Sequence, residues 1–146
     1  MSHTNLLYHI VFATKDRAPL ITDNLRPGLH EYLGGIVRNL NGTALEINGI
    51  ADHVHLLVIL PPTLAVSDFM SKLKANSSTW AKRQTNGRFA WQSRYGAFTV
   101  SESQIERVRE YIRHQEEHHR RRAFADEYKA LLRAHRIEFD EAHLWT

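Results

Sequence analysis

Residues 51–60 read ADHVHLLVIL, and this stretch decides the fold of the chain. The apolar run 56–60 predicts a buried strand, which two prolines end directly afterwards. His53 and His55 open the strand two positions apart, so both imidazoles project from the same face. One ring nitrogen from each can bind a single metal ion, as paired imidazoles commonly do. Two histidines that only bond to water or backbone at a strand end are the alternative interpretation.

The composition is that of a globular protein with a single core. The 146 residues are 42% hydrophobic and 24% charged, and we expect one domain over residues 1–146. The sequence has no cysteine, which excludes disulfides, thiolate zinc sites and cysteine nucleophiles. Its first residues lack the pattern of a signal peptide, and no apolar run reaches the roughly 18 residues of a membrane span. We therefore expect a cytoplasmic protein that does not enter membranes.

Positive charge gathers in the middle of the sequence. The net charge is only +3, yet between residues 61 and 100 Asp68 is the only acidic residue. The basic residues of this segment are Lys72, Lys74, Lys82, Arg83, Arg88 and Arg94. Such an imbalance favours contact with a polyanion, and an ordinary solvated helix face is the competing interpretation.

The order of predicted elements indicates an α+β fold. Strands are expected at residues 5–14, 43–50, 51–60 and 95–100, with helices ending near 39 and spanning 68–83 between them. The order β-α-β-β-α-β predicts a ferredoxin-like core, in which an antiparallel sheet is packed against helices. Further helices at 102–119 and 124–135 follow this core at the C-terminal end.

The helix predicted over residues 102–119 carries further candidate site residues. Tyr111 and Gln115 are four positions apart, at the margin of an apolar stripe, so both side chains can reach a site beside the sheet. Packing for Tyr111 and solvation for Gln115 are the alternative roles. His118 and His119 continue the same flank as rival ligands, and we rank them lower because the arginine run that follows indicates a helix end.

With these features the sequence resembles a known family, the single-tyrosine HUH transposases of insertion sequences, together with their relatives associated with repetitive extragenic palindromes. The segments LLYHIVFATK, ADHVHLLV, RYGAFTVS and VREYIRHQEEHH follow in the family's order and span nearly the whole chain. His53-Val54-His55 fits the His-hydrophobic-His motif, and Tyr111 with Gln115 fits the Tyr-x-x-x-Gln motif.

The resemblance implies a transposase that cuts and joins single-stranded DNA. His53, His55 and Gln115 would hold Mg²⁺ or Mn²⁺, and Tyr111 would attack the phosphorus of the scissile phosphate. The expected products are a 5′-phosphotyrosine and a free 3′-OH. Because the phosphotyrosine link conserves the energy of the broken bond, another 3′-OH can later attack it and rejoin the strand without ATP. Imidazole ligands favour Mn²⁺ over Mg²⁺.

The family also implies partners for the chain. These are single-stranded DNA with hairpin ends and a second copy of the chain, in a homodimer where Tyr111 of one subunit can serve the histidine pair of the other. We assign contacts with the DNA backbone to basic residues of the middle segment and to those that follow the first strand. The residues concerned are Lys15, Arg17, Lys72, Lys74 and Arg94.

Two other classes of function remain as alternatives. A non-catalytic module that binds single-stranded nucleic acid would need neither a divalent ion nor Tyr111. A metal-dependent phosphoesterase that uses water would cleave without a covalent adduct. The second alternative normally needs another histidine motif of the His-x-Thr or His-x-Ser type, and His3 before Thr4 lacks the required spacing.

Overall fold

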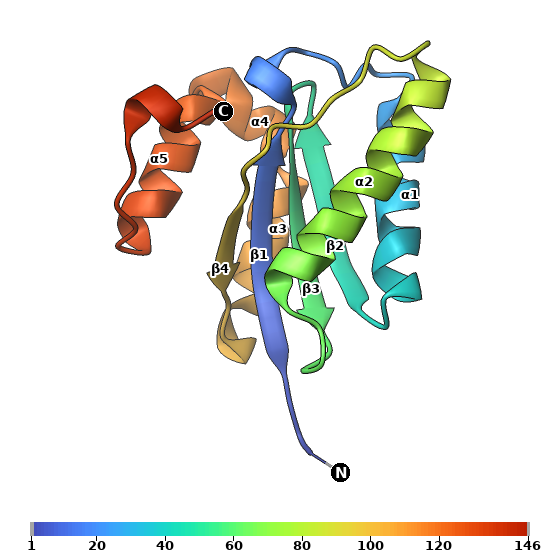
Figure 1. Cartoon of the computed structure of the whole chain (residues 1–146). Coiled ribbons are helices and arrows are strands. Elements are labelled where there is room, and N and C mark those ends of the chain that lie inside the picture. Colours follow the sequence, from blue (N-terminus) through green and yellow to red (C-terminus); the bar gives the residue numbers. More distant parts are fainter. Residues whose placement is uncertain (1, 146) are drawn as a thin grey trace.

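A four-stranded antiparallel sheet forms the centre of the protein in the computed structural model, which describes residues 2–145 (Figure 1). The side chains of residues 120 and 121 lie outside the described part. The strands are β1 (Leu6–Ala13), β2 (Thr43–Ile50), β3 (His53–Leu60) and β4 (Gly96–Thr99). The helices are α1 (Arg26–Asn39), α2 (Val66–Gln84), α3 (Ile105–Arg113), α4 (Gln115–Arg121) and α5 (Phe124–Ala134). Short 3₁₀ turns occur at η1 (Lys15–Arg17), η2 (Glu102–Gln104) and η3 (Glu141–His143).

The strand order is β2-β3-β1-β4, so β1 and β3 are the central strands. The structure confirms the ferredoxin-like prediction, and β2 and β3 pair as an antiparallel hairpin. Antiparallel pairing of β1 with β3 sets Ala13 opposite His53 and Val11 opposite His55. The start of β3 therefore meets the end of β1, and the histidine pair lies at one end of the sheet.

A glycine lets the neighbouring strand approach the histidine pair. Gly49 of β2 lies opposite Val54 of β3. A Cβ atom at this position would overlap the carbonyl oxygen of His53. The close approach of the two backbones therefore requires a residue without a side chain.

The two faces of the sheet are covered by different helices (Figure 1). Helices α1 and α2 cover one face, where alternate residues of β1 and β3 enter a large apolar core. From these two strands the core takes Ile10, Phe12, Val54, Leu56, Val58 and Leu60. Residues at the intervening positions point to the other face, towards α3, α4 and α5, because side chains alternate along a strand.

The helix predicted over residues 102–119 is broken, which corrects the prediction of one continuous helix. His114 has φ −99° and ψ 27°, outside the helical range, and it separates α3 from α4. Its ring Nδ1 lies 2.7 Å from the carbonyl oxygen of Glu110, in addition to the backbone hydrogen bond that this oxygen accepts. This local bond competes with helical geometry. None of the helices formed by residues 2–145 is long and apolar enough to cross a membrane.

Candidate active site

His53 is fully buried at the start of β3, on the face that α3, α4 and α5 cover. Its Nδ1 lies 2.8 Å from the Asp52 Oδ1 atom, and its Nε2 lies 3.1 Å from Oε1 of Gln115. A carboxylate that holds one ring nitrogen fixes the orientation of the other, as it does for many metal-bound histidines. The structure therefore brings together His53 and Gln115, two of the ligands that the family resemblance implied.

His55 is also fully buried, and both of its ring nitrogens have partners. Nδ1 lies 2.8 Å from Nε2 of His9 on β1, and Nε2 lies 2.9 Å from Oε1 of Glu127 on α5. Burial lowers the pKa of His55 to about 4, although the hydrogen bond with Glu127 acts in the opposite direction. A neutral imidazole is the form that binds metal ions.

Glu127 is a site residue that sequence reasoning missed. Its Oε1 lies 2.9 Å from Nε2 of His55 and 3.8 Å from Nε2 of His53, and only 4% of its side chain is exposed. Burial acts to raise the pKa of Glu127, but hydrogen bonds from His119, His55 and Tyr111 outweigh it and hold the pKa well below its ordinary range. The carboxylate is therefore ionised at neutral pH.

One signal in the sequence could have found Glu127. The apolar stripe of α5 includes Phe124, Tyr128 and Leu131, and Glu127 lies three positions after the first of these and four before the last. An acidic residue on the buried stripe of a helix needs a partner in the interior, because burying an unpaired charge is costly.

His119 joins the same cluster, although the sequence analysis ranked it below Gln115. Its Nε2 lies 3.1 Å from Oε1 of Gln115, and its Nδ1 lies 2.8 Å from the carbonyl oxygen of Arg122. The possible ligand atoms of His53, His119 and Glu127 all lie within 4.8 Å of one another, so this group can hold a metal ion. His118 instead packs beside Tyr111, with their ring centroids 4.8 Å apart.

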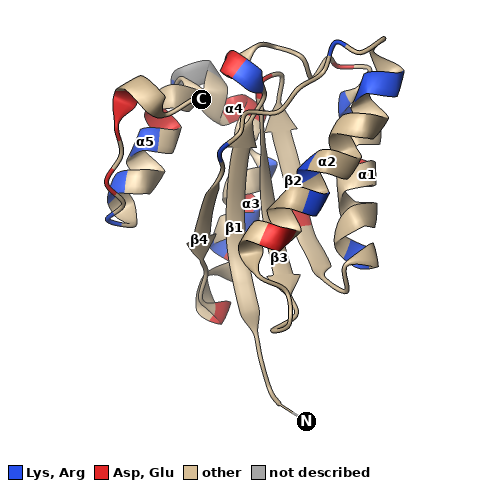
Figure 2. Ribbon diagram, viewed as in Figure 1, with Lys and Arg blue, Asp and Glu red and all other residues tan. Residues whose placement is uncertain are grey.

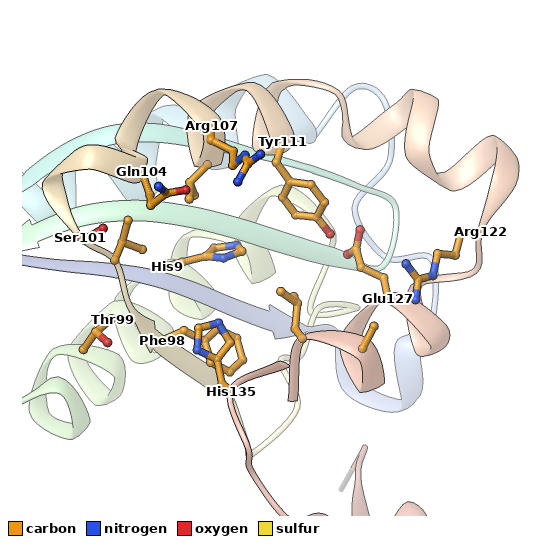
Figure 3. A pocket seen from close by; sticks show the side chains of 14 residues that line it. His9, Phe98, Thr99, Ser101, Gln104, Arg107, Tyr111, Arg122, Glu127 and His135 are labelled. Carbon is orange, nitrogen blue, oxygen red and sulfur yellow. The ribbon is translucent and has the colours of Figure 1, made fainter. Parts of the chain in front are cut away.

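Tyr111 on α3 completes the cluster (Figure 3). Its ring lies edge-on to His9 and His55, with centroids 6.1 and 5.8 Å away. Burial, together with the charge of Glu127 and a hydrogen bond to its carboxylate, raises the pKa of Tyr111 well above its ordinary range. The phenol therefore keeps its proton at neutral pH, and this proton lies in the hydrogen bond with Glu127.

The basic residues predicted to contact DNA are divided between two regions (Figure 2). Lys15 and Arg17 lie in η1, directly after β1 and at the same end of the sheet as the histidine pair. Lys72 lies on α2, which covers the opposite face. The ammonium of Lys74 donates hydrogen bonds of 2.8 and 2.7 Å to two backbone carbonyls of the loop after α2, one of them that of Arg94. Contact of these five residues with DNA stays a prediction.

Together these features define a class of protein. A ferredoxin-like sheet, two histidines side by side on a central strand, and a tyrosine beside them on a later helix are the arrangement of tyrosine-dependent HUH DNA strand transferases. The chain belongs to the family of IS200-like transposases, whose sequence profile matches residues 2–115. The match ends at Gln115, so α5 with Glu127 lies beyond it.

Individual relatives agree with this assignment. The chain is 33% identical over 124 residues to the transposase for insertion sequence element IS200 of Salmonella typhimurium, covering 79% of this chain and 81% of that protein. It is 28% identical over 117 residues to the ISDra2 transposase TnpA of Deinococcus radiodurans, covering 75% and 84%.

Solved structures show the same fold. A candidate transposase from Deinococcus radiodurans R1 matches with a TM-score of 0.65 and 27% identity, over 78% of this chain and 93% of that chain. A REP-associated tyrosine transposase bound to a REP hairpin matches with a TM-score of 0.61 over 82% and 74% of the two chains. The second pair is only 15% identical, so this likeness extends to the fold alone.

Proposed function

We propose that this transposase cleaves and rejoins single-stranded DNA through a 5′-phosphotyrosine intermediate on Tyr111. The observation that carries the proposal is the convergence of the Tyr111 side chain with His53, His55 and Gln115 at one end of the sheet. A nucleophile and ligands for a divalent ion at one point are what a phosphodiester transfer requires.

We further propose that His53, His55 and Gln115 hold Mg²⁺ or Mn²⁺. Glu127 lies within reach of the same ion, since its carboxylate is 2.9 Å from one histidine nitrogen and 3.8 Å from the other. Imidazole nitrogens with amide and carboxylate oxygens suit Mn²⁺, and the oxygens also suit Mg²⁺. When bound, the ion polarises the scissile phosphate and offsets the charge that develops on it.

In the proposed cleavage reaction, each bond that forms is matched by a bond that breaks. The Tyr111 oxygen forms a bond to phosphorus while the bond from phosphorus to the 3′-oxygen breaks. The hydrogen bond to Glu127 holds the phenolic proton in the resting site, and this proton leaves to solvent as the bond to phosphorus forms. The leaving 3′-oxygen takes up a proton to become a hydroxyl, and attack by another 3′-OH reverses the sequence.

The proposal includes DNA with hairpin ends as the substrate, by analogy with the REP-associated transposase bound to a hairpin. It also includes a homodimer and a cytoplasmic location, as the family resemblance implies. Tyr111 already contacts His55 of its own chain, with ring centroids 5.8 Å apart. This contact supports catalysis within one subunit, and exchange of Tyr111 between the subunits of a dimer is the alternative.

The test uses purified protein and labelled single-stranded DNA from the regions that flank the gene, with Mn²⁺ or with EDTA. We expect a covalent adduct on a denaturing gel that requires the ion and vanishes in Tyr111→Phe. Tyr32→Phe is the matched control, because Tyr32 is 38% exposed and lies on α1. Cleavage without an adduct would instead identify a phosphoesterase that uses water. Binding that neither EDTA nor Tyr111→Phe affects would identify a binding module.

A further inference from the structure

A groove extends from Tyr111 between α3 and α5, over β1 and β4, whose residues His9, Phe98 and Thr99 help to line it (Figure 3). Its volume is about 540 Å³, within the range of pockets that hold small ligands. The hydroxyl of Tyr111 and the carboxylate of Glu127 point towards each other at one end (Figure 3). A molecule in the groove would therefore lie directly beside the proposed nucleophile.

Three rings form the floor of the groove: His135 is exposed, whereas Phe98 and His9 are buried. The ring of His135 stacks on Phe98 with centroids 4.4 Å apart and an interplanar angle of 20°. His9 meets Phe98 edge-on at 6.1 Å, while Val108 and Leu131 provide apolar walls. Stacked rings between apolar walls are a surface on which nucleic-acid bases pack without need for a particular sequence.

Positive charge is available on both sides of the groove. Arg107 projects from α3, and Arg122 lies between α4 and α5. Among residues 2–145, neither guanidinium forms an ion pair with a side-chain carboxylate, whereas Arg109 and Arg113 on the same helix both pair with Glu46. Arginines without an acidic partner beside a stacking surface are well suited to the phosphates of a single strand.

We propose that this groove binds the nucleotide adjacent to the scissile phosphate. Its base packs on the exposed ring of His135, which the buried ring of Phe98 supports, and the flanking phosphates contact Arg107 and Arg122. The inference rests on the proposed function and adds the contact through which the strand reaches Tyr111. It also assigns a role to α5, whose residues Glu127, Ala130 and Leu131 line the groove and which follows the segment that the family profile matches.

The experiment measures binding of a short, unstructured, fluorescein-labelled DNA strand by fluorescence anisotropy in the presence of Mn²⁺. All proteins carry Tyr111→Phe, so that no strand is cleaved. Leu131→Trp fills the groove and should weaken binding about tenfold, the loss expected when one base no longer stacks. Ile137→Trp adds the same ring at a side chain that is 41% exposed and outside the groove, and should leave binding unchanged.

A second variant tests the charge without altering any packing. Arg107→Gln should weaken binding and reduce the slope of log affinity against log salt by about one phosphate contact. Arg38→Gln on α1 removes the same charge from the opposite face and should leave the slope unchanged. Melting curves of all variants establish that each one is folded.

Parental affinity in both folded Leu131→Trp and Arg107→Gln would overturn the inference. The adduct assay on proteins with Tyr111 intact separates this failure from a failure of the proposed function. If the adduct forms and both variants bind DNA with unchanged affinity, the groove is not a DNA site, and the proposed tyrosine mechanism still stands. Weakened binding without any ion-dependent adduct in the parent protein supports the groove as a DNA site and rejects the tyrosine mechanism.

Discussion

The two faces of the sheet are formed by the same strands, but they bury different kinds of side chain. On the side of α1 and α2, the alternate side chains of β1 and β3 are aliphatic or aromatic, and they form the larger of the two cores. On the side of α3 and α5, the intervening positions include His9, His53 and His55, which are buried together with Gln115 and Glu127. One face therefore provides most of the hydrophobic stabilisation, and the other holds buried polar groups that a stable fold does not need.

One fully buried and one partly buried histidine illustrate the difference. Burial lowers the pKa of both His30 and His55 to about 4. Both ring nitrogens of His55 have hydrogen-bond partners, whereas Nε2 of His30 on α1 has no partner within the described part of the chain. The pKa is thus lowered alike in two different settings. His55 lies in an ordered polar network, whereas His30 is partly buried beside Arg26. A cluster in which every polar group is paired keeps a defined geometry.

The largest expected effect concerns the polar face. His53→Ala should slow formation of the covalent adduct about a thousandfold, because a catalytic ion supplies several kcal/mol of transition-state stabilisation. Adduct formation is followed over time on denaturing gels. His30→Gln, a change of a partly buried histidine on the opposite face, is the control and should retain the parental rate. Equal losses in both variants would contradict the division between the faces.

The next effect concerns the apolar face. Leu33 of α1 is fully buried, and Leu33→Ala should lower the free energy of unfolding by about 2–5 kcal/mol through the cavity it leaves. Urea titrations measure this change. The rate of adduct formation per folded molecule should stay at the parental value. A slower rate in fully folded Leu33→Ala protein would show that core packing controls the site.

A pH-dependent effect should come from His30. The folded pKa of about 4 lies below the ordinary 6.5, so between these values the unfolded chain binds a proton that the folded chain does not. Stability from this group is therefore complete above pH 6.5 and is lost as the pH falls towards 4. His30→Gln should reduce the stability difference between pH 7 and pH 4.5 by about 2 kcal/mol. Urea titrations at both pH values test this, and an unchanged difference would contradict it.

The smallest effect distinguishes two neighbouring acids on α5. Glu127→Gln should weaken Mn²⁺ binding about tenfold, since residues that hold or orient metal ligands typically have effects of this size. Asp126→Asn changes an exposed carboxylate one position earlier and should leave Mn²⁺ affinity unchanged. Isothermal titration calorimetry measures both. Parental affinity in Glu127→Gln would mean that the carboxylate only orders the ion-free site.

Much of the fold could be predicted from local patterns. The apolar run 56–60 predicted a buried strand, and the two-residue spacing of His53 and His55 placed both histidines on one face, and the structure agrees. The element order predicted the ferredoxin-like sheet, whose strand order is β2-β3-β1-β4. The break at His114 was missed because helix periodicity does not show it: at the break, the side chain of Asn48 on β2 donates to the carbonyl oxygens of Ile112 and Arg113.

The site divides in the same way. The sequence was enough to propose His53 and His55 as candidate ligands and Tyr111 as candidate nucleophile, because each motif lies within one strand or one helix. Only the tertiary structure brought in His9, 46 positions from His55, and Glu127, 72 positions from it. Periodicity shows which face of an element is buried, but not which distant element packs against that face. The partner of His55 was therefore decided by how α5 packs on the sheet.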